Sequence, residues 1–330
     1  MPAPSLSIIV IVYNMARQAM NTLYSLSTAH QRNVQPTDYE VIVVENRSHN
    51  TLDAAAVQAL PGRFRYFLRE ETGVSPVPAL NFAAQQAQGR QLGLIIDGAR
   101  MVTPRVVEYV LACMRMTAHP LVAVPGYNLG PAEQQFHHDM QYNEQTESAL
   151  LARVNWQANG YRLFDIANLS GANPKGPLHL FLECNCLFTS RAAFESNGGA
   201  DERFTLPGGG SINLHLYRQL GLHHLHDRFF VLPGEGSFHQ FHGGVTTSQS
   251  IAREQLLEQF RIQLNDIWHG QFGGALKREP ILLGAITSHA QQTVAASSRW
   301  AQHRFSRMRD EDLPFWPDDV SFPHDTFASS

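Results

Sequence analysis

Residues 1–125 alternate short, wholly apolar runs with amphipathic stretches. Residues 5–13 are rich in Ile and Val and show no polar alternation, which is typical of a parallel strand buried on both faces. In residues 15–30 apolar side chains recur at helical spacing, and residues 41–45 return to the strand pattern, with Asn14 placed to cap the intervening helix. The chain is therefore predicted to open with a βαβ unit.

The same alternation continues to about residue 125. Further strands are predicted at residues 64–68, 92–96 and 121–124, and further helices at residues 78–88 and 104–116. This order predicts an α/β fold with a doubly wound, mostly parallel central sheet and helices on both faces, which binds ligands at the carboxyl ends of its strands. Asn14, Glu45 and Asp97 each lie at such an end.

The regular alternation fades after Pro125. We expect a polar helical insert at residues 132–154, strands at residues 178–188 and 228–232, and a long helix at about residues 248–268. Residues 313–330 are rich in Pro, Asp and Phe without a period, and are expected to form a surface-wrapping or mobile tail.

Composition and charge exclude several classes of protein. A formal charge of −4, with no block of Lys or Arg, argues against general nucleic-acid binding. The longest apolar run, Ile8 to Val12, is far shorter than the ~20 residues of a spanning helix, and the N-terminus lacks a signal-peptide pattern. We expect a cytoplasmic protein, and peripheral contact with the inner membrane face stays open. Three cysteines without metal-site spacing are interpreted as reduced.

Two common phosphate-binding motifs are missing from the sequence. No G-x-G-x-x-G follows Tyr13, and no G-x-x-x-x-G-K-[ST] occurs anywhere. A dinucleotide-binding protein and a P-loop nucleotidase are therefore not favoured.

Four motifs in order resemble the GT-A glycosyltransferases of family 2. They are Ser7-Ile-Ile-Val-Ile-Val-Tyr-Asn14, Tyr39-Glu-Val-Ile-Val-Val-Glu-Asn46, Ala87-Gln-Gly-Arg90 leading into Leu94-Ile-Ile-Asp97, and Gly198-Gly-Ala-Asp-Glu-Arg-Phe204. The resemblance spans residues 5–244 and implies a single GT-A domain. Residues 1–125 would be its nucleotide-sugar-binding half and residues 126–247 its acceptor-binding half, with a C-terminal helical segment and tail at residues 248–330.

The resemblance assigns the donor site to the strand ends. Tyr13 and Asn14 would flank the base and ribose of a nucleotide-sugar, which we expect to be UDP-linked, and Glu45 would accept hydrogen bonds from the base or ribose. Asp97 would be the first acid of the D-x-D motif, which holds the diphosphate through a divalent cation, Mn²⁺ or Mg²⁺. Because Ala99 replaces the second acid, Arg100 and Arg90 are candidates for additional positive charge.

A second source of metal ligands lies in Phe238-His-Gln-Phe-His-Gly-Gly-Val-Thr246. In the enzymes that this chain resembles, a late histidine often completes the metal site. His239 and His242 are the candidates, although a structural histidine pair near a glycine turn is an alternative.

The base that takes the acceptor proton is harder to assign. Alignment with the usual acid-Leu of the family places Ser211 at the position of the base, where serine has no useful basicity at neutral pH. Glu183 is the preferred substitute, because an acid within an apolar strand is costly to bury unless it is paired or functional. Asp201 and His215 are weaker alternatives, and Glu183 paired with an arginine for structure alone stays open.

The sequence thus favours an inverting glycosyltransferase that acts on a glycan or lipid-linked acceptor. The missing acids at Ala99 and Ser211 keep an alternative open, namely a related protein that binds a nucleotide-sugar or a partner without transfer. A nucleotidyltransferase is less favoured, because Met15-Ala-Arg-Gln18 is not the Gly-rich, basic loop that such an enzyme needs after its first strand.

Overall fold

The structure, a computed structural model, describes residues 3–71, 73–132, 142–173, 176–242, 251–270, 276 and 278–310. Within these residues, the larger sheet has eight strands in the order β12-β10-β6-β9-β4-β1-β2-β3. Only β9 runs antiparallel to its neighbours β4 and β6. The strands are β1 (Leu6–Val12), β2 (Tyr39–Asn46), β3 (Phe64–Arg69), β4 (Gln91–Ile95), β6 (Pro120–Ala123), β9 (Leu187–Ser190), β10 (Arg228–Val231) and β12 (Ile281–Leu282). The predicted α/β fold with a mostly parallel sheet is confirmed.

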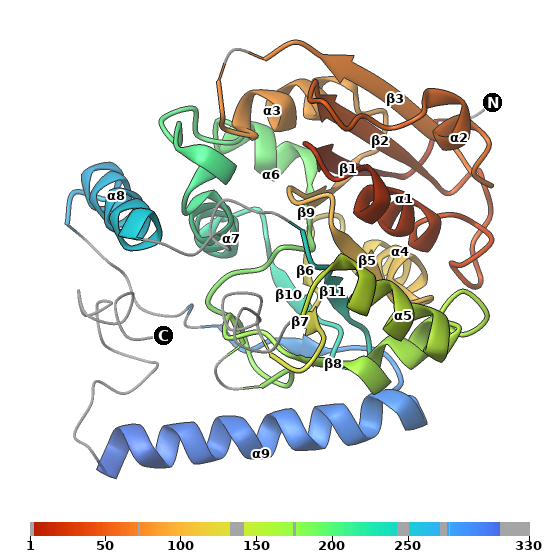
Figure 1. Cartoon of the computed structure of the whole chain (residues 1–330). Helices are drawn as coiled ribbons and strands as arrows, with labels where there is room; N and C mark the ends of the chain where they lie inside the picture. Colours follow the sequence, from red (N-terminus) through yellow and green to blue (C-terminus); the bar gives the residue numbers. More distant parts are fainter. Residues whose placement is uncertain are drawn as a thin grey trace.

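Helices cover both faces of this sheet (Figure 1). One face carries α1 (Ala16–Ser25), α2 (Ala54–Gln58) and α4 (Val106–Met116), and the other carries α3 (Val77–Gln86), α6 (Arg191–Ser196), α7 (Ile212–Leu222) and α8 (Ile251–Ile267). Ile9 and Ile11 of β1 pack toward α3, whereas Ile8 and Val10 pack toward α1. Because both faces are covered, the strand shows no polar alternation.

A smaller sheet, which the sequence analysis did not predict, lies beside the first. Its order is β5-β11-β7-β8, formed by β5 (Arg100–Val102), β11 (Ser237–His239), β7 (Gly126–Leu129) and β8 (Ala167–Leu169). Its core includes Tyr127 and Phe238, whose rings stack 5.3 Å apart. The antiparallel register of β5 and β11 places His239 opposite Arg100, and so links two regions that are distant in the sequence.

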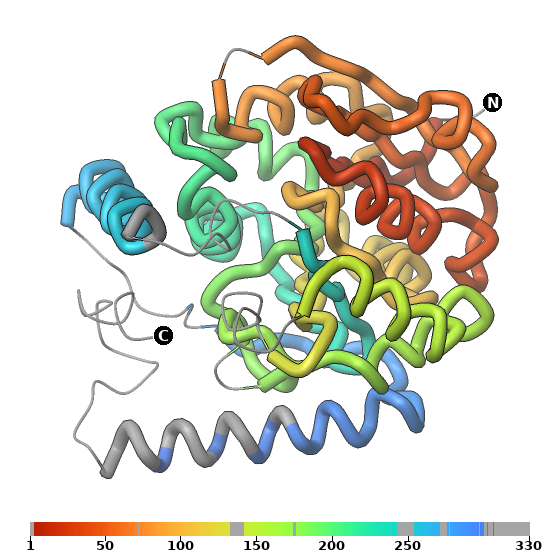
Figure 2. The backbone as a smooth tube through the Cα atoms, viewed as in Figure 1, coloured from red at the N-terminus to blue at the C-terminus, as the bar shows by residue number. Residues whose placement is uncertain are grey.

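Three further helical elements surround the smaller sheet. Helix α5 (Glu144–Val154) lies beside α1, and α9 (Ser288–Asp310) packs against η3 (Gly160–Ile166) and β8 (Figures 1 and 2). Among the described residues, no helix is both long and apolar enough to span a bilayer.

Several predicted boundaries need correction. The strand expected at residues 178–188 begins only at Leu187, because the backbone N–H groups of Phe181 and Leu182 donate to the Tyr217 hydroxyl and the Ala172 carbonyl rather than to a neighbouring strand. Helix α1 ends at Ser25. Residues 133–141 of the predicted insert and the whole expected tail at residues 313–330 lie outside the described residues.

Candidate functional site

The polar ends of the parallel strands meet at one edge of the larger sheet. The register pairs Val12 of β1 with Glu45 of β2, and Val10 of β1 with Ile95 of β4. Asn14 and Asp97 follow these strands at the same edge, as the sequence pattern predicted. In an open α/β sheet this edge is where ligands bind.

A tight turn carries the chain from β4 into the smaller sheet. A Cβ atom on Gly98 would lie 2.8 Å from the Ile11 carbonyl oxygen, so glycine permits the turn to pack against the end of β1. Ala99 is fully buried, and its carbonyl accepts a hydrogen bond from the backbone N–H of Gln240 at 2.9 Å. The turn therefore holds Asp97 beside the end of β11.

Asp97, His239 and His242 converge at this point. The His239 Nε2 atom lies 2.8 Å from Asp97 Oδ2, and His242 Nε2 lies 3.7 Å from Asp97 Oδ1. The two Nε2 atoms are 3.0 Å apart. Their side chains keep 13–21% of their surface exposed, so the group is open to a ligand.

This group fits a divalent cation. With metal–ligand bonds of about 2.0–2.2 Å, two ligands of a tetrahedral or octahedral ion lie roughly 3.0–3.6 Å apart, close to the separations in this group. Burial, aided by Arg100, lowers the pKa of His239 to about 4 against the opposing effect of Asp97, so its imidazole is neutral at neutral pH. Burial alone would raise the pKa of Asp97, but the two imidazoles hold it well below its usual range. One carboxylate and two imidazoles are suitable ligands for Mn²⁺.

Arg100 lies next to this group. Its Nε atom is 3.4 Å from Asp97 Oδ2 and has no hydrogen-bond partner among the described residues, although the residue is only 8% exposed. A guanidinium held here neutralises part of the Asp97 charge, and it places positive charge at the same edge of the sheet.

The residues expected to contact the nucleotide differ in accessibility. Tyr13 is 60% exposed, and the exposed Asn14 has a left-handed φ of 54°. The N-cap of α1 is Met15, so the prediction that Asn14 caps this helix is wrong. Glu45 is fully buried, where it accepts hydrogen bonds from the Tyr66 hydroxyl at 2.6 Å and the Leu52 amide at 3.0 Å. Burial raises its pKa despite these bonds.

The sequence analysis missed Asn46, the last residue of β2. It is 8% exposed, and its side-chain Oδ1 has no hydrogen-bond partner among the described residues. A buried oxygen left unpaired costs about 1–3 kcal/mol, so such an atom is a candidate acceptor for a ligand N–H. Its place after Glu45 at the end of a predicted strand was the available signal.

The four candidates for the base lie in different surroundings. Ser211 is the N-cap of α7 and follows Gly208, Gly209 and Gly210, all with positive φ. Asp201 pairs with Arg203 at 2.6 Å, and Arg203 lowers its pKa, which makes it a weaker base.

Glu183 does not lie within a strand, so the premise of a buried mid-strand acid is wrong. It is half-buried and accepts a hydrogen bond from Asn185 Nδ2 at 3.3 Å. The charges of both Glu183 and Arg100 act on Cys184, whose pKa burial raises to about 12. Glu183 therefore lies within electrostatic range of the same thiol as Arg100.

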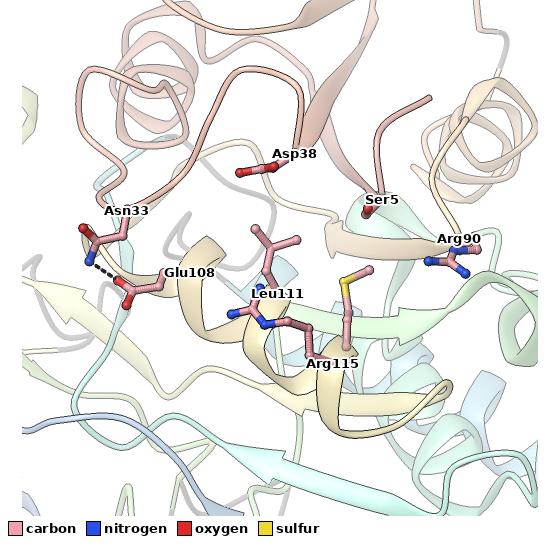
Figure 3. Close-up of a pocket in the computed structure, with 8 residues that line it drawn as sticks. Ser5, Asn33, Asp38, Arg90, Glu108, Leu111 and Arg115 are labelled. Atoms are coloured by element: carbon pink, nitrogen blue, oxygen red, sulfur yellow. Dashed lines mark hydrogen bonds between the residues drawn. The ribbon is translucent and has the colours of Figure 1, made fainter. Parts of the chain in front are cut away.

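Among the described residues, two of the cavities lie apart from the Asp97 group. One, of about 600 Å³, is lined by Asp201, His215 and Trp268, and the Trp268 indole donates to His215 Nδ1 at 2.8 Å. The other, of about 210 Å³, is lined by Ser5 and Arg90 (Figure 3). Arg90 directly precedes β4, whose five residues span roughly 17 Å, and Asp97 lies beyond the other end of this strand, so the two residues lie at opposite ends of the strand. The suggestion that Arg90 contacts the diphosphate is therefore wrong.

Comparisons with known proteins identify similar sequences and folds. The sequence model described as glycosyl transferase family 2 matches residues 7–182, more than half of the 330 residues. No curated protein matches the chain.

Among solved structures, S. aureus TarS is similar in fold, with a TM-score of 0.50 and 14% identity over 93% of this chain and 44% of that chain. This chain thus spans less than half of that TarS chain. The fragment TarS 1-349 gives a TM-score of 0.51 at 14% identity, over 94% of this chain and 74% of that chain. The same fragment in complex with UDP-GlcNAc gives 0.49 at 14% identity, over 92% and 73%.

Proposed function

Because this chain belongs to glycosyl transferase family 2, we propose that it transfers a sugar from a UDP-sugar to a hydroxyl group of a glycan or lipid-linked acceptor, with inversion at the anomeric carbon. The observation that carries this proposal is the convergence of Asp97, His239 and His242 at the carboxyl edge of the parallel strands. Ligand-binding groups gather there from two sheets, at the edge that α/β folds use for substrates.

The donor nucleotide would lie over the ends of β1 and β2. Tyr13 offers an exposed ring on which a base can stack, and Asn14 lies beside it. The unpaired Oδ1 of Asn46 would accept the ring N–H of uracil. Glu45 is fully buried and already accepts from Tyr66 and Leu52, so it would support this strand end rather than bond to the base or ribose as the resemblance implied.

Asp97, His239 and His242 would hold a divalent cation, for which Mn²⁺ is favoured because imidazole suits it better than Mg²⁺. When bound, this cation supplies positive charge to the diphosphate that leaves during transfer. Arg100 would add a fixed positive charge at the same edge, which stabilises the same leaving group without a proton transfer.

Glu183 would act as the base. In this step its carboxylate takes the proton of the acceptor hydroxyl, the hydroxyl oxygen bonds to the anomeric carbon, and the bond from that carbon to the diphosphate oxygen breaks. The electron pair of the broken bond leaves with the diphosphate. Ser211 and Asp201 are less suited, since serine is not basic and Asp201 is already paired with Arg203.

A second candidate function is binding of a nucleotide-sugar without transfer. It is favoured by the absence of acids at Ala99 and Ser211, where the enzymes that this chain resembles carry the second metal ligand and the base. Both candidates keep the donor site, so donor binding alone does not separate them.

A screen of nucleotide-sugars by thermal shift and by donor hydrolysis, each with Mn²⁺ and with a chelator, tests the proposal. UDP-GlcNAc is the first probe, since it was bound to the TarS 1-349 fragment, and GDP- and CMP-sugars serve as controls. We expect Mn²⁺-dependent stabilisation and slow hydrolysis with one UDP-sugar. Stabilisation without hydrolysis or transfer to any acceptor favours the second candidate, and no response to any nucleotide-sugar contradicts both.

A further inference from the structure

The backbone between the two histidines is held by helices outside the metal-binding group. Gln240 is fully buried, and its Nε2 atom donates to the carbonyl oxygen of Gln18 at 2.8 Å, while its Oε1 atom accepts from Asn21 Nδ2 at 2.9 Å. Both partners belong to α1. The residue after His239 is therefore fixed to α1, the helix that follows Tyr13 and Asn14, which we call the donor-binding loop.

Phe241 is held at both of its backbone polar groups. Its N–H donates to Glu147 Oε2 of α5 at 2.6 Å. Its carbonyl accepts from Gln18 Nε2 at 2.7 Å and from Arg17 Nη2 at 3.3 Å. Because Phe241 directly precedes His242, these bonds determine where the imidazole of His242 lies relative to Asp97.

Glu147 is the centre of this arrangement. Its side chain is fully buried, pairs with Arg17 Nη2 at 3.1 Å and accepts from the Tyr142 hydroxyl at 3.4 Å. Helix stability alone does not call for a carboxylate here, since a buried ion pair is often no more stabilising than apolar side chains of the same volume. A carboxylate does, however, provide a strong and directional acceptor for the Phe241 N–H.

We propose that Glu147 and Arg17 are positioning residues for His239 and His242, and that they couple the metal site to the donor-binding loop. Arg17 is the second residue of α1, which begins two residues after Asn14. A displacement of the donor-binding loop would therefore be transmitted through Arg17 and Glu147 to Phe241 and His242. This proposal rests on the proposed function.

The experiment uses the full chain with Glu147→Ala and Glu147→Gln. Glu40→Gln is the matched control, because Glu40 is also fully buried and also accepts from an arginine, a hydroxyl and a backbone N–H. It lies at the amino end of β2, whereas the Asp97 group lies at the carboxyl ends of the parallel strands. Thermal unfolding first establishes that each variant folds. If the Glu147 variants do not fold, Arg17→Gln replaces them, since Arg17 is 31% exposed on its side chain.

The first measurement is amide hydrogen exchange of residues 240–242 in metal-free protein. Loss of a hydrogen bond to a charged acceptor should speed exchange of the Phe241 amide about tenfold in Glu147→Ala, and less in Glu147→Gln, which keeps one acceptor oxygen. The second is the Mn²⁺ concentration that gives half of the Mn²⁺-enhanced binding of UDP-GlcNAc. Loss of a group that orients metal ligands should raise it about 10- to 100-fold.

Faster exchange together with a raised Mn²⁺ requirement in the Glu147 variants, and neither in Glu40→Gln, supports the proposal. Unchanged exchange in the Glu147 variants overturns the proposal. A Mn²⁺ requirement that rises less than twofold in these variants, or that rises equally in Glu40→Gln, also overturns it. If Arg17→Gln is used, an unchanged Mn²⁺ requirement overturns it likewise. If donor binding by the parent protein ignores Mn²⁺, the metal site of the proposed function itself fails, and with it this role of Glu147, whatever the exchange result.

Discussion

Glu235 should make the stability of this protein depend on pH. This residue lies between β10 and β11 and is fully buried. It accepts hydrogen bonds from the Tyr161 hydroxyl at 2.7 Å and from the Arg105 backbone N–H at 3.3 Å. Burial raises its pKa from 4.5 to about 7, although these bonds oppose the rise. The Glu235→Gln variant removes the titration and keeps an acceptor oxygen.

The size and sign of the effect follow from this shift. At about 1.4 kcal/mol per pKa unit, a rise from 4.5 to about 7 corresponds to about 3 kcal/mol. The folded protein keeps the proton that the unfolded chain loses above pH 4.5. The contribution of Glu235 to the free energy of unfolding is therefore complete below the unfolded pKa of 4.5, and it is lost as pH rises through the folded pKa of about 7. Glu235→Gln should have no such loss.

Urea or thermal unfolding of both proteins at a series of pH values between about 4.5 and 8 measures the effect. The difference in unfolding free energy between parent and variant should move by about 3 kcal/mol in favour of the variant as pH rises, or roughly 4 °C in Tm for a chain of this length. Taking the difference cancels the titration of groups that both proteins share. A constant difference across this range would show that the pKa of Glu235 is not raised in the folded protein, and that the burial argument is wrong.

Three predictions concern the site. Asp97→Ala should weaken binding of UDP-GlcNAc in the presence of Mn²⁺ by about tenfold or more, because the cation would lose its one carboxylate ligand. Equal affinities of variant and parent by calorimetry would show that Asp97 is not part of the site. The double variant His239→Ala, His242→Ala should lose the Mn²⁺ enhancement and keep the donor affinity seen in chelator; an unchanged enhancement would place the metal elsewhere. Glu183→Gln should lower turnover about 100-fold or more with little change in donor affinity, as expected for a base, and unchanged turnover would return Glu183 to a structural role.

The larger sheet was predictable because its strands carry a strong signal. Strands covered by helices on both faces consist of continuous Val and Ile runs, and β1, β2 and β4 all lie within two residues of their predicted bounds. The smaller sheet was not predictable, since its strands have three or four residues each, too few to show a period of two. Helix α9 was missed for a related reason: of its described side chains, only Ala290 and Val294 are buried, so it has a weak apolar face.

The candidate site also has a part that the sequence predicted and a part that it did not. Asp97 was predictable as a strand-end acid, and the two histidines came from the resemblance to a family. Asp97 lies close to these histidines because β5 pairs with β11, and no local sequence pattern predicts that pairing. For Glu183 the sequence indicated a buried strand position, but hydrogen bonds from Phe181 and Leu182 to loop and helix partners keep this segment out of the sheet.

The missing second acid and the presence of two histidines can be explained by one local structure. Ala99 is fully buried, and its carbonyl bonds to Gln240, so this position serves to join the D-x-D turn to the segment after β11. A carboxylate at position 99 would have to be buried in that contact, where an unpaired charge is costly. The same contact brings His239 to 2.8 Å from Asp97 and His242 to 3.7 Å. In the proposed metal site these imidazoles would take the place of the acid absent from the turn, so an alanine at position 99 is compatible with that proposal.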